Sequence, residues 1–413
     1  MLKENVDVLV IGAGPSGCVA ASYLHNNGVK IKVVERSKFP RFVIGESLIP
    51  RVMDHFEEAG LLDALKAMGF EKKFGARFIR GKELCVFDFS EKFGEGWDWT
   101  WQVPRADFDN TLAQEVVKKG VDLEFETEVL NVVFDGSNSV TTVKDKDGTI
   151  KEIHAKFIID SSGYGRVLPR ILKLDAPSSI PENSSMFAHV KDTNRPEGVE
   201  GTQITFDILE TKVWLWVIPF SNGNTSIGVV GPTSYINAIE GDTNAEKLKN
   251  IINLSDFYKG RFEGVDFLFE PHKIENYSCS VTQLCGPGYT LTGNSSEFLD
   301  PVFSSGVCFA TESGMLSAKL FLKELNGEKV EWDTDYTKYM RRGVNVFATY
   351  VKEWYTGNLQ TLFFHQPENP DVKEKICSVL AGYVWNEENP FVKKHDRVIK
   401  SMAYMLENEK SAQ

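Results

Sequence analysis

The chain has 413 residues, with 46 Lys or Arg against 58 Asp or Glu, so its formal net charge is −12 at pH 7. This acidic balance argues against a nucleic-acid-binding protein, and because no run of 18 apolar residues occurs, no membrane span is expected. Six scattered cysteines without a CxxC or Cys/His cluster support neither a metal site nor a disulfide framework. We therefore expect a reduced, cytoplasmic protein of two or three domains.

The first 36 residues carry the clearest motif. An apolar run, VDVLVIG, leads into the turn GAGPSG, and a helical segment and a second apolar run follow. Glycines allow the backbone to approach a pyrophosphate, and the acid that ends the second run can accept a hydrogen bond from a ribose hydroxyl. This order predicts a dinucleotide site. Its expected contacts are Gly12, Gly14, Pro15, Ser16, Gly17, Glu35 and Arg36.

Hydrophobic spacing predicts the elements that follow. Apolar residues at helical spacing indicate a helix near 50–68, and alternating residues with aromatics indicate strands over 76–104. The further elements expected in chain order are a helix over 107–119, strands within 121–134, 140–160 and 185–232, a polar helix-forming linker over 237–256, a strand over 289–293, a helix over 306–325, and a helical, aromatic-rich tail over 335–413.

Two later segments favour FAD over NAD. KFIIDSSGYGR (156–166) and GYTLTGNSSEFLDPVFSSGV (288–307) resemble the further fingerprints of the glutathione-reductase-type FAD fold, as found in aromatic hydroxylases. The resemblance implies that the later segment contacts the ribityl chain and the flavin ring, where a helix start favours negative charge. The FAD contacts implied are Arg105, Asp160, Gly163, Gly293, Asn294, Asp300, Pro301, Ser305, Gly306 and Val307. The family usually has Asp where Asn294 stands, so this side chain can accept a hydrogen bond only without charge assistance.

Three short motifs then narrow the kind of flavoprotein. They are WxWxIP at Trp214–Pro219, KxGxxF beginning at Lys73, and DPVFSSG at 300–306. Together with RFVIGESLIP (41–50), which contains Glu46 and Ser47, they resemble the flavin-dependent halogenases. The likeness is to the branch that acts on phenols, pyrroles or carrier-tethered acyl groups rather than on free tryptophan.

The resemblance implies a reaction and its residues. Reduced FAD, O₂ and a halide ion held near Ser305 and Gly306 would give hypohalous acid, which passes through a tunnel to Lys73. The lysine would then deliver the halogen to an electron-rich aromatic substrate, free or carrier-tethered. Trp214 and Trp216 would separate the flavin from that substrate. Because no second GxGxxG motif occurs, either NAD(P)H visits transiently or a separate flavin reductase supplies FADH₂.

Other interpretations of the same residues stay open. Lys73 follows Lys72 in a polar stretch and can be a solvated lysine, the two tryptophans can form a purely structural face, and Asp300 can simply turn the chain. The same fold also serves FAD-dependent monooxygenases and geranylgeranyl-reductase-like dehydrogenases, which carry a segment similar to WLWVIP. A non-catalytic flavoprotein is a third possibility.

The fold class expected from these patterns is α/β. It combines a glutathione-reductase-type FAD-binding Rossmann fold, a β-sheet substrate domain and a helical C-terminal region. The boundaries expected are 1–175, with strands inserted near 76–104, and 276–330 for the FAD-binding domain, 176–275 for the substrate domain and 331–413 for the helical region.

Overall fold

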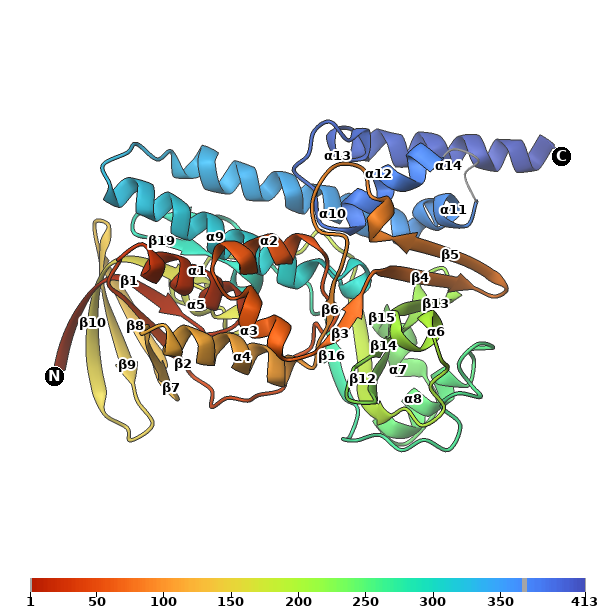
Figure 1. The fold of residues 1–413 in the computed structure, drawn as a ribbon, viewed down its shortest axis with the longest axis horizontal. Helices are drawn as coiled ribbons and strands as arrows, with labels where there is room; N and C mark the ends of the chain where they lie inside the picture. Colours follow the sequence, from red (N-terminus) through yellow and green to blue (C-terminus); the bar gives the residue numbers. More distant parts are fainter. Residues whose placement is uncertain (1, 366–369, 413) are drawn as a thin grey trace.

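The computed structural model describes residues 2–365 and 370–412, and its strands form two large sheets with helices packed around them (Figure 1). The first sheet follows the order β18–β19–β10–β1–β2–β7, with β9 and β8 attached to β10. Its strands are β1 (Leu2–Ile11), β2 (Ile31–Glu35), β7 (Asp122–Phe125), β8 (Glu128–Asp135), β9 (Asn138–Lys144), β10 (Ile150–Asp160), β18 (Cys285–Gly286) and β19 (Tyr289–Leu291).

The centre of this sheet is the expected Rossmann-type unit. Strand β1 pairs in parallel with β2 on one side and β10 on the other, and helix α1 (Pro15–Asn26) connects β1 to β2. Every residue of β2 is buried, as expected for a parallel strand covered on both faces. The carboxyl ends of β1, β2, β10 and β19 therefore meet at one edge, where ligands bind in such sheets.

The second sheet follows the order β16–β12–β15–β14–β13–β4–β5. Its strands are β4 (Gly75–Arg80), β5 (Glu83–Asp88), β12 (Asn183–Lys191), β13 (Thr205–Glu210), β14 (Val213–Pro219), β15 (Asn224–Pro232) and β16 (His272–Glu275). Strands β4 and β5 fall within the range assigned above to the FAD-binding domain, but β4 hydrogen-bonds in parallel to β13 of the second sheet. This pairing joins residues far apart in sequence, so local patterns do not reveal it.

Alternation along β14 gives the second sheet two different faces. Trp214 and Trp216 point toward the main core, while Val213, Leu215 and Val217 pack in a separate cluster with the short helices α7 (Thr233–Ala238) and α8 (Asn244–Ile252). Two small sheets, β3 (Glu71–Lys73) with β6 (Thr100–Gln102) and β11 (Asp175–Ala176) with β17 (Ser280–Val281), complete the strands.

The helix expected near 50–68 is two helices, α2 (Arg51–Glu58) and α3 (Leu62–Ala67). The chain turns between them at Gly60, whose φ of +66° is in the region that favours glycine. Helix α4 (Arg105–Lys118) packs on α1 and α3. The remaining short helices in this half of the chain are α5 (Val167–Leu172) and α6 (Val199–Thr202).

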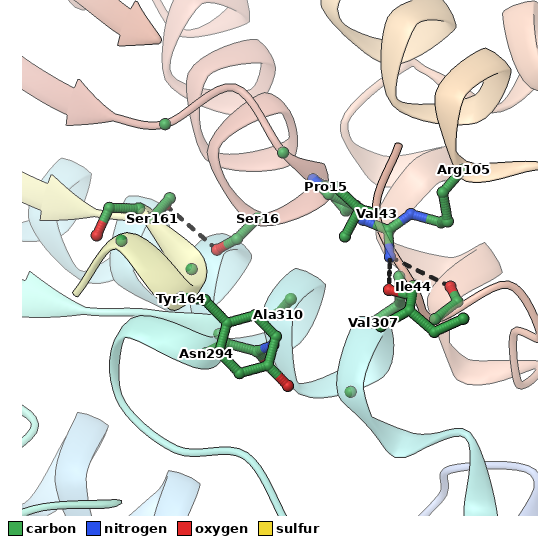
Figure 2. A pocket seen from close by; sticks show the side chains of 18 of the residues that line it. Pro15, Ser16, Val43, Ile44, Arg105, Ser161, Tyr164, Asn294, Val307 and Ala310 are labelled. Carbon is green, nitrogen blue, oxygen red and sulfur yellow. Dashed lines mark hydrogen bonds between the residues drawn. The ribbon is translucent and has the colours of Figure 1, made fainter. Parts of the chain in front are cut away.

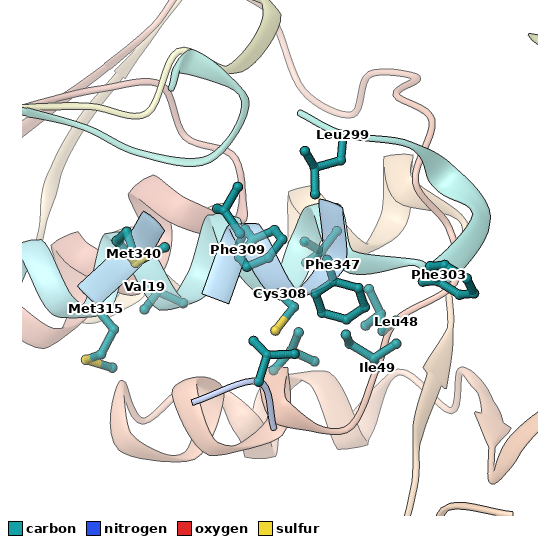
Figure 3. Close-up of a cluster of buried hydrophobic side chains, with 14 of the residues drawn as sticks. Val19, Leu48, Ile49, Leu299, Phe303, Cys308, Phe309, Met315, Met340 and Phe347 are labelled. Atoms are coloured by element: carbon teal, nitrogen blue, oxygen red, sulfur yellow. The ribbon is translucent and has the colours of Figure 1, made fainter. Parts of the chain in front are cut away.

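Helix α9 (Ser305–Leu325) crosses the centre of the molecule. Figure 3 shows its buried side chains Cys308, Phe309 and Met315 in one cluster with Val19 of α1 and Phe347 of α10 (Tyr339–Thr356). The C-terminal helices α11 (Asn358–Phe364), α12 (Pro370–Leu380), α13 (Pro390–Lys393) and α14 (His395–Ala412) then lie along one side of the molecule. Among the described helices, none is long and apolar enough to cross a bilayer.

Candidate active site

Of the three glycines in the turn after β1, only Gly14 has open space at the position where a side chain would be. A Cβ on Gly12, whose φ is +101°, would lie 2.5 Å from the Ser161 carbonyl oxygen, and one on Gly17 would lie 2.0 Å from the Gly12 carbonyl oxygen. A Cβ on Gly14 would meet only the Arg41 guanidinium, at 3.7 Å. Gly12 and Gly17 are therefore needed for the protein's own packing, while Gly14 keeps a cavity clear.

That cavity has a volume of about 630 Å³ and is lined by residues from both large sheets. Figure 2 shows the part of it between Pro15 of α1, Arg105 of α4 and Val307 of α9. Most of the residues predicted from sequence line it. They are Gly12, Gly14, Pro15, Ser16, Glu35, Arg36, Glu46, Ser47, Arg105, Gly163, Trp214, Trp216, Gly293, Asn294, Pro301, Gly306 and Val307. Gly17, Lys73, Asp160, Asp300 and Ser305 are absent from its wall.

Two buried carboxylates hold the turns of the first sheet in place. Glu35 accepts hydrogen bonds from the backbone N–H groups of Ala13 and Ser37, both at 2.9 Å, and lines the cavity. Asp160 accepts from the N–H groups of Ser162 at 2.9 Å and Leu168 at 2.7 Å, so both of its oxygens serve the protein. These bonds shape the 160–168 turn, and a direct contact between Asp160 and a cofactor stays a prediction.

Arg105 fixes the loop that covers the cavity. Its guanidinium donates to the carbonyl oxygens of Ile44 at 3.0 Å and Gly45 at 3.2 Å, and pairs with Asp109 of its own helix. Figure 2 shows Arg105 reaching from α4 toward Ile44. Arg41 also pairs with Asp109, at 3.0 Å, and lines the cavity. Sequence reasoning missed Arg41, although its place just before the GES segment and the charge of its side chain were visible.

Hydroxyl groups join the three segments around the glycine turn. Thr292 Oγ1 lies 2.8 Å from Ser16 Oγ and 2.7 Å from Ser161 Oγ. Gly293 N–H donates to Ser313 Oγ at 2.9 Å, which fixes the Gly-Asn turn on α9. Residues 16, 161 and 292 lie far apart in sequence, and these contacts place the three fingerprint segments at one cavity.

The start of α9 faces the cavity with its backbone. Ser304 adopts a left-handed conformation, with φ of +56°, and no side chain caps the helix. Ser304, Gly306 and Val307 line the cavity, while the Ser305 side chain is buried away from it. The first backbone N–H groups of a helix have no partner within it and favour an anion. The anion site at 305–306 stays a prediction, and backbone N–H groups rather than the Ser305 hydroxyl are available for it on the cavity wall.

Asp300 belongs to a buried network beside the cavity. Its carboxylate accepts hydrogen bonds from Tyr355 at 2.9 Å, Tyr277 at 3.0 Å and the Val302 N–H at 3.0 Å. Burial raises the pKa of Asp300 to about 6. Asp300 thus binds the two tyrosines and the turn that carries Pro301, and its contact with FAD stays a prediction.

The two tryptophans of WxWxIP form part of the cavity wall. Trp214 donates from Nε1 to the Tyr355 hydroxyl at 3.3 Å, and Trp216 donates from Nε1 to Ser226 Oγ at 3.0 Å. Their ring centroids are 6.2 Å apart. Hydrogen bonds at the indole nitrogens hold both rings in fixed orientations, so this wall is rigid and apolar.

Lys73 is buried, which contradicts the alternative interpretation of a solvated lysine. Its residue exposure is 2%, and Nζ donates to Ser47 Oγ at 2.8 Å and to the Leu48 carbonyl oxygen at 2.7 Å. No carboxylate in the described part of the chain pairs with it, and burial lowers its pKa to about 7. Ser47 lines the cavity, so one side chain separates Lys73 from the cavity.

Comparisons with known proteins show the family and the fold of the chain. Residues 5–255 match the family model described as FAD binding domain. A solved flavoprotein/dehydrogenase from Cytophaga hutchinsonii is 52% identical, covers 98% of this chain and 100% of its own, and superposes with a TM-score of 0.96. A 1H-pyrrole-2-carbonyl-[peptidyl-carrier protein] brominase from Pseudoalteromonas luteoviolacea is 27% identical over 92% of each chain. A flavin-dependent halogenase from Armillaria mellea is 30% identical over 80% of this chain and 67% of its own.

The fold, the cavity and these matches define an FAD-dependent oxidoreductase. The cavity fits FAD because a Cβ at Gly14 would enter it and because the start of α9 offers backbone N–H groups to it. Within this class, the chain belongs to the flavin-dependent halogenase family.

Proposed function

We propose that this enzyme oxidises a halide to hypohalous acid and uses the acid to halogenate an electron-rich aromatic compound. Bound FAD, once reduced, would supply the electrons that O₂ needs for this oxidation. The residues proposed to hold FAD are the cavity-lining ones named above, with Arg36 and Glu35 beside the ribose and the 293–307 segment beside the flavin.

The observation that carries the proposal is that Lys73 is buried without an acidic partner in the described part of the chain. An ordinary lysine is almost fully protonated at neutral pH, but burial without an acidic partner lowers the Lys73 pKa to about 7. A large share of the amine is then neutral and nucleophilic at neutral pH. Reaction of the neutral amine with hypohalous acid forms an N–halogen bond, breaks the O–halogen bond and releases water, which balances without another reactant.

The aromatic wall supports the same chemistry. Trp214, Trp216 and Phe206 present apolar rings to the cavity, and Phe206 lies 5.5 Å from Trp214. We infer that they keep the aromatic substrate away from the flavin, so that a small oxidant has to travel between them. Ser47 lies between the cavity and the Lys73 amine and is the proposed point of passage.

The substrate is inferred from a relative, and the electron donor from the absence of a second GxGxxG motif in the sequence. The brominase from P. luteoviolacea acts on a pyrrole-2-carbonyl group on a peptidyl carrier protein, as its name states. A pyrrole or phenol, free or tethered to a carrier, is therefore the substrate class that we propose, with a separate flavin reductase as the source of FADH₂.

A dehydrogenase or reductase activity is the second candidate. The 52% identical relative is described as a flavoprotein/dehydrogenase, and the side chain of Ser47 closes Lys73 off from the cavity wall in this structure. A dehydrogenase would need no halide and no Lys73 amine. These two requirements separate the candidates.

The test is turnover of the FAD-loaded enzyme with a flavin reductase, NADH, O₂ and a pyrrole or phenol probe, with bromide present or omitted. We expect a brominated product by mass spectrometry only when bromide is present. Lys73→Met should reduce that product by orders of magnitude, whereas Lys72→Met, at the exposed neighbour on β3, should have little effect. Substrate oxidation without halide, unchanged in Lys73→Met, would replace the halogenase proposal with the dehydrogenase.

A further inference from the structure

The two tryptophans of the cavity wall are fixed by different parts of the molecule. Trp216 donates from Nε1 to Ser226 Oγ at 3.0 Å, and Ser226 belongs to β15, the neighbouring strand of the same sheet. Trp214 donates instead to the hydroxyl of Tyr355 at 3.3 Å, on α10 of the C-terminal helical region. An indole has a single N–H donor. Trp214 therefore depends for this contact on a helix that belongs to neither sheet.

The Tyr355 hydroxyl continues the contact to the turn before α9. It donates to Asp300 Oδ2 at 2.9 Å. Asp300 Oδ1 in turn accepts from the Val302 N–H at 3.0 Å, inside the short 3₁₀ turn Pro301–Phe303 that leads into α9. Three hydrogen bonds in series thus connect the Trp214 ring on β14, through α10, to the turn from which α9 starts.

The end of α10 is itself tied to the strand that carries Trp214. Gln360 of α11 donates from Nε2 to the Thr211 carbonyl oxygen at 2.8 Å and to the Trp354 carbonyl oxygen at 3.2 Å. Thr211 lies in the turn between β13 and β14. Because Tyr355 follows Trp354 and is only 5% exposed, its hydroxyl has little freedom to move.

We propose that Tyr355 is a positioning residue, which holds the Trp214 ring at a fixed distance from the start of α9. Both ends of this distance belong to the wall of the flavin cavity, with Trp214 on one side and Gly306 on the other. The Trp214 ring packs against the rings of Phe206 and Trp216, at centroid distances of 5.5 and 6.2 Å. A displaced Trp214 would therefore move the aromatic wall as a whole, and the helical region takes part in the reaction through Tyr355.

The consequence for the chemistry rests on the proposed function. Reduced FAD, O₂, a halide ion and a proton give FAD, hypohalous acid and water. Reduced FAD, O₂ and an aromatic compound that reaches the flavin would give FAD, the hydroxylated compound and water, and with neither reactant FAD and H₂O₂ result. Since the aromatic wall keeps the substrate away from the flavin, a correctly placed Trp214 should favour the first of these three outcomes.

The first test measures the position of Trp214 in the full-length apo-protein by ¹⁹F NMR after labelling with 5-fluorotryptophan. The chain has eight tryptophans, so the Trp214 signal is identified by its loss in Trp214→Phe. In Tyr355→Phe this signal should move by more than its linewidth, because the indole N–H has lost its partner. The matched control is Tyr350→Phe, on the same helix, whose buried hydroxyl has no partner in the described chain and which should leave the signal in place.

The second test measures how FADH₂ oxidation is divided among brominated product, hydroxylated product and H₂O₂. It uses the FAD-loaded enzyme with a flavin reductase, NADH, O₂, bromide and the pyrrole probe. Tyr355→Phe should lower the brominated fraction about tenfold while total FADH₂ oxidation changes less than about twofold. Trp214→Phe should lower the fraction similarly, and the double variant should be no worse than either single variant, because Tyr355 acts through Trp214. Tyr350→Phe should keep the wild-type fraction.

A second variant keeps the proposal open to test if Tyr355→Phe does not fold. Gln360→Ala releases the end of α10 but retains the Tyr355 hydroxyl, and it should move the Trp214 signal by a smaller amount in the same direction.

An unmoved Trp214 signal in both Tyr355→Phe and Gln360→Ala would overturn the proposal, as would additive losses of brominated product in the double variant. If the wild-type enzyme makes no brominated product, the halogenase proposal fails, and the position of Trp214 is decided by its ¹⁹F signal alone.

Discussion

Lys73 shows how the surroundings of a single residue decide its chemistry. Its amine donates two hydrogen bonds, to Ser47 and to the Leu48 carbonyl, and no described carboxylate balances a positive charge. Burial therefore lowers its pKa to about 7, whereas in the unfolded chain the pKa is about 10.4. Between these two values the unfolded state binds more protons than the folded state, so the contribution of Lys73 to stability rises with pH.

The first prediction concerns this pH dependence. Between about pH 7 and about pH 9, the free energy of unfolding of the wild type should rise relative to Lys73→Met, by at most about 1.4 kcal/mol per pH unit. Urea unfolding of both proteins at several pH values measures the difference. Lys72→Met is the control and should show a constant difference from the wild type. A constant difference for Lys73→Met as well would mean that the amine stays charged in the folded protein.

At the scale of elements, two glycines of the turn between β1 and α1 are expected to have different roles. Gly17 serves the packing of the protein, and Gly14 serves the binding of the cofactor. Gly17→Ala would place a Cβ 2.0 Å from the Gly12 carbonyl oxygen, whereas Gly14→Ala would place one in the cavity with its nearest neighbour 3.7 Å away. We predict that Gly17→Ala lowers the thermal midpoint of the apo-protein. Gly14→Ala should leave that midpoint unchanged and weaken FAD binding at least tenfold, about 1.4 kcal/mol, in fluorescence titrations. Unchanged FAD affinity in Gly14→Ala would show that the cofactor does not approach this turn.

Helix α10 carries two buried tyrosines, one inside the Asp300 network and one outside it, so that a variant of the second is a control for a variant of the first. The Tyr355 hydroxyl donates to Asp300 and accepts from Trp214, while the Tyr350 hydroxyl is buried with no partner in the described chain. Tyr355→Phe leaves buried polar groups unpaired and should cost about 1–3 kcal/mol. Tyr350→Phe removes an unsatisfied hydroxyl and should be neutral or stabilising.

Urea unfolding of these two variants measures the costs directly, provided that the m-values agree with the wild type. Equal destabilisation of both variants would indicate a packing effect of α10 rather than the network. The same samples report whether FAD binds more weakly in Tyr355→Phe, as expected if Asp300 positions the turn at Pro301.

At the scale of the whole molecule, local sequence patterns predicted the parts of the fold that depend on near neighbours. The turn GAGPSG, the strand before it and the helix after it lie within about two dozen residues, so spacing alone indicates them. The fingerprint segments near 160 and 293 were likewise recognisable one by one. The structure adds that hydroxyl groups of Ser16, Ser161 and Thr292 join them.

Features that depend on distant pairings could not be predicted in this way. Strand β4 joins β13 across more than a hundred residues, and Glu46 meets His189 across 143. Because Lys72 precedes it in a polar stretch, a solvated Lys73 stayed open as an alternative, but pairing of β3 with β6 turns Lys72 outward and Lys73 into the core. Periodicity over three residues is too short to assign the face of such a strand.

The central claim is that one cavity brings FAD and a halide together at the start of α9. Its most direct test is anomalous scattering from bromide in crystals of the FAD-bound enzyme. We predict a bromide ion in hydrogen-bond contact with the backbone N–H groups near Gly306 and Val307, on the side of the cavity that faces Ser47. Full FAD occupancy with no bromide at this position, at the halide concentration of the turnover assay, would contradict the claim.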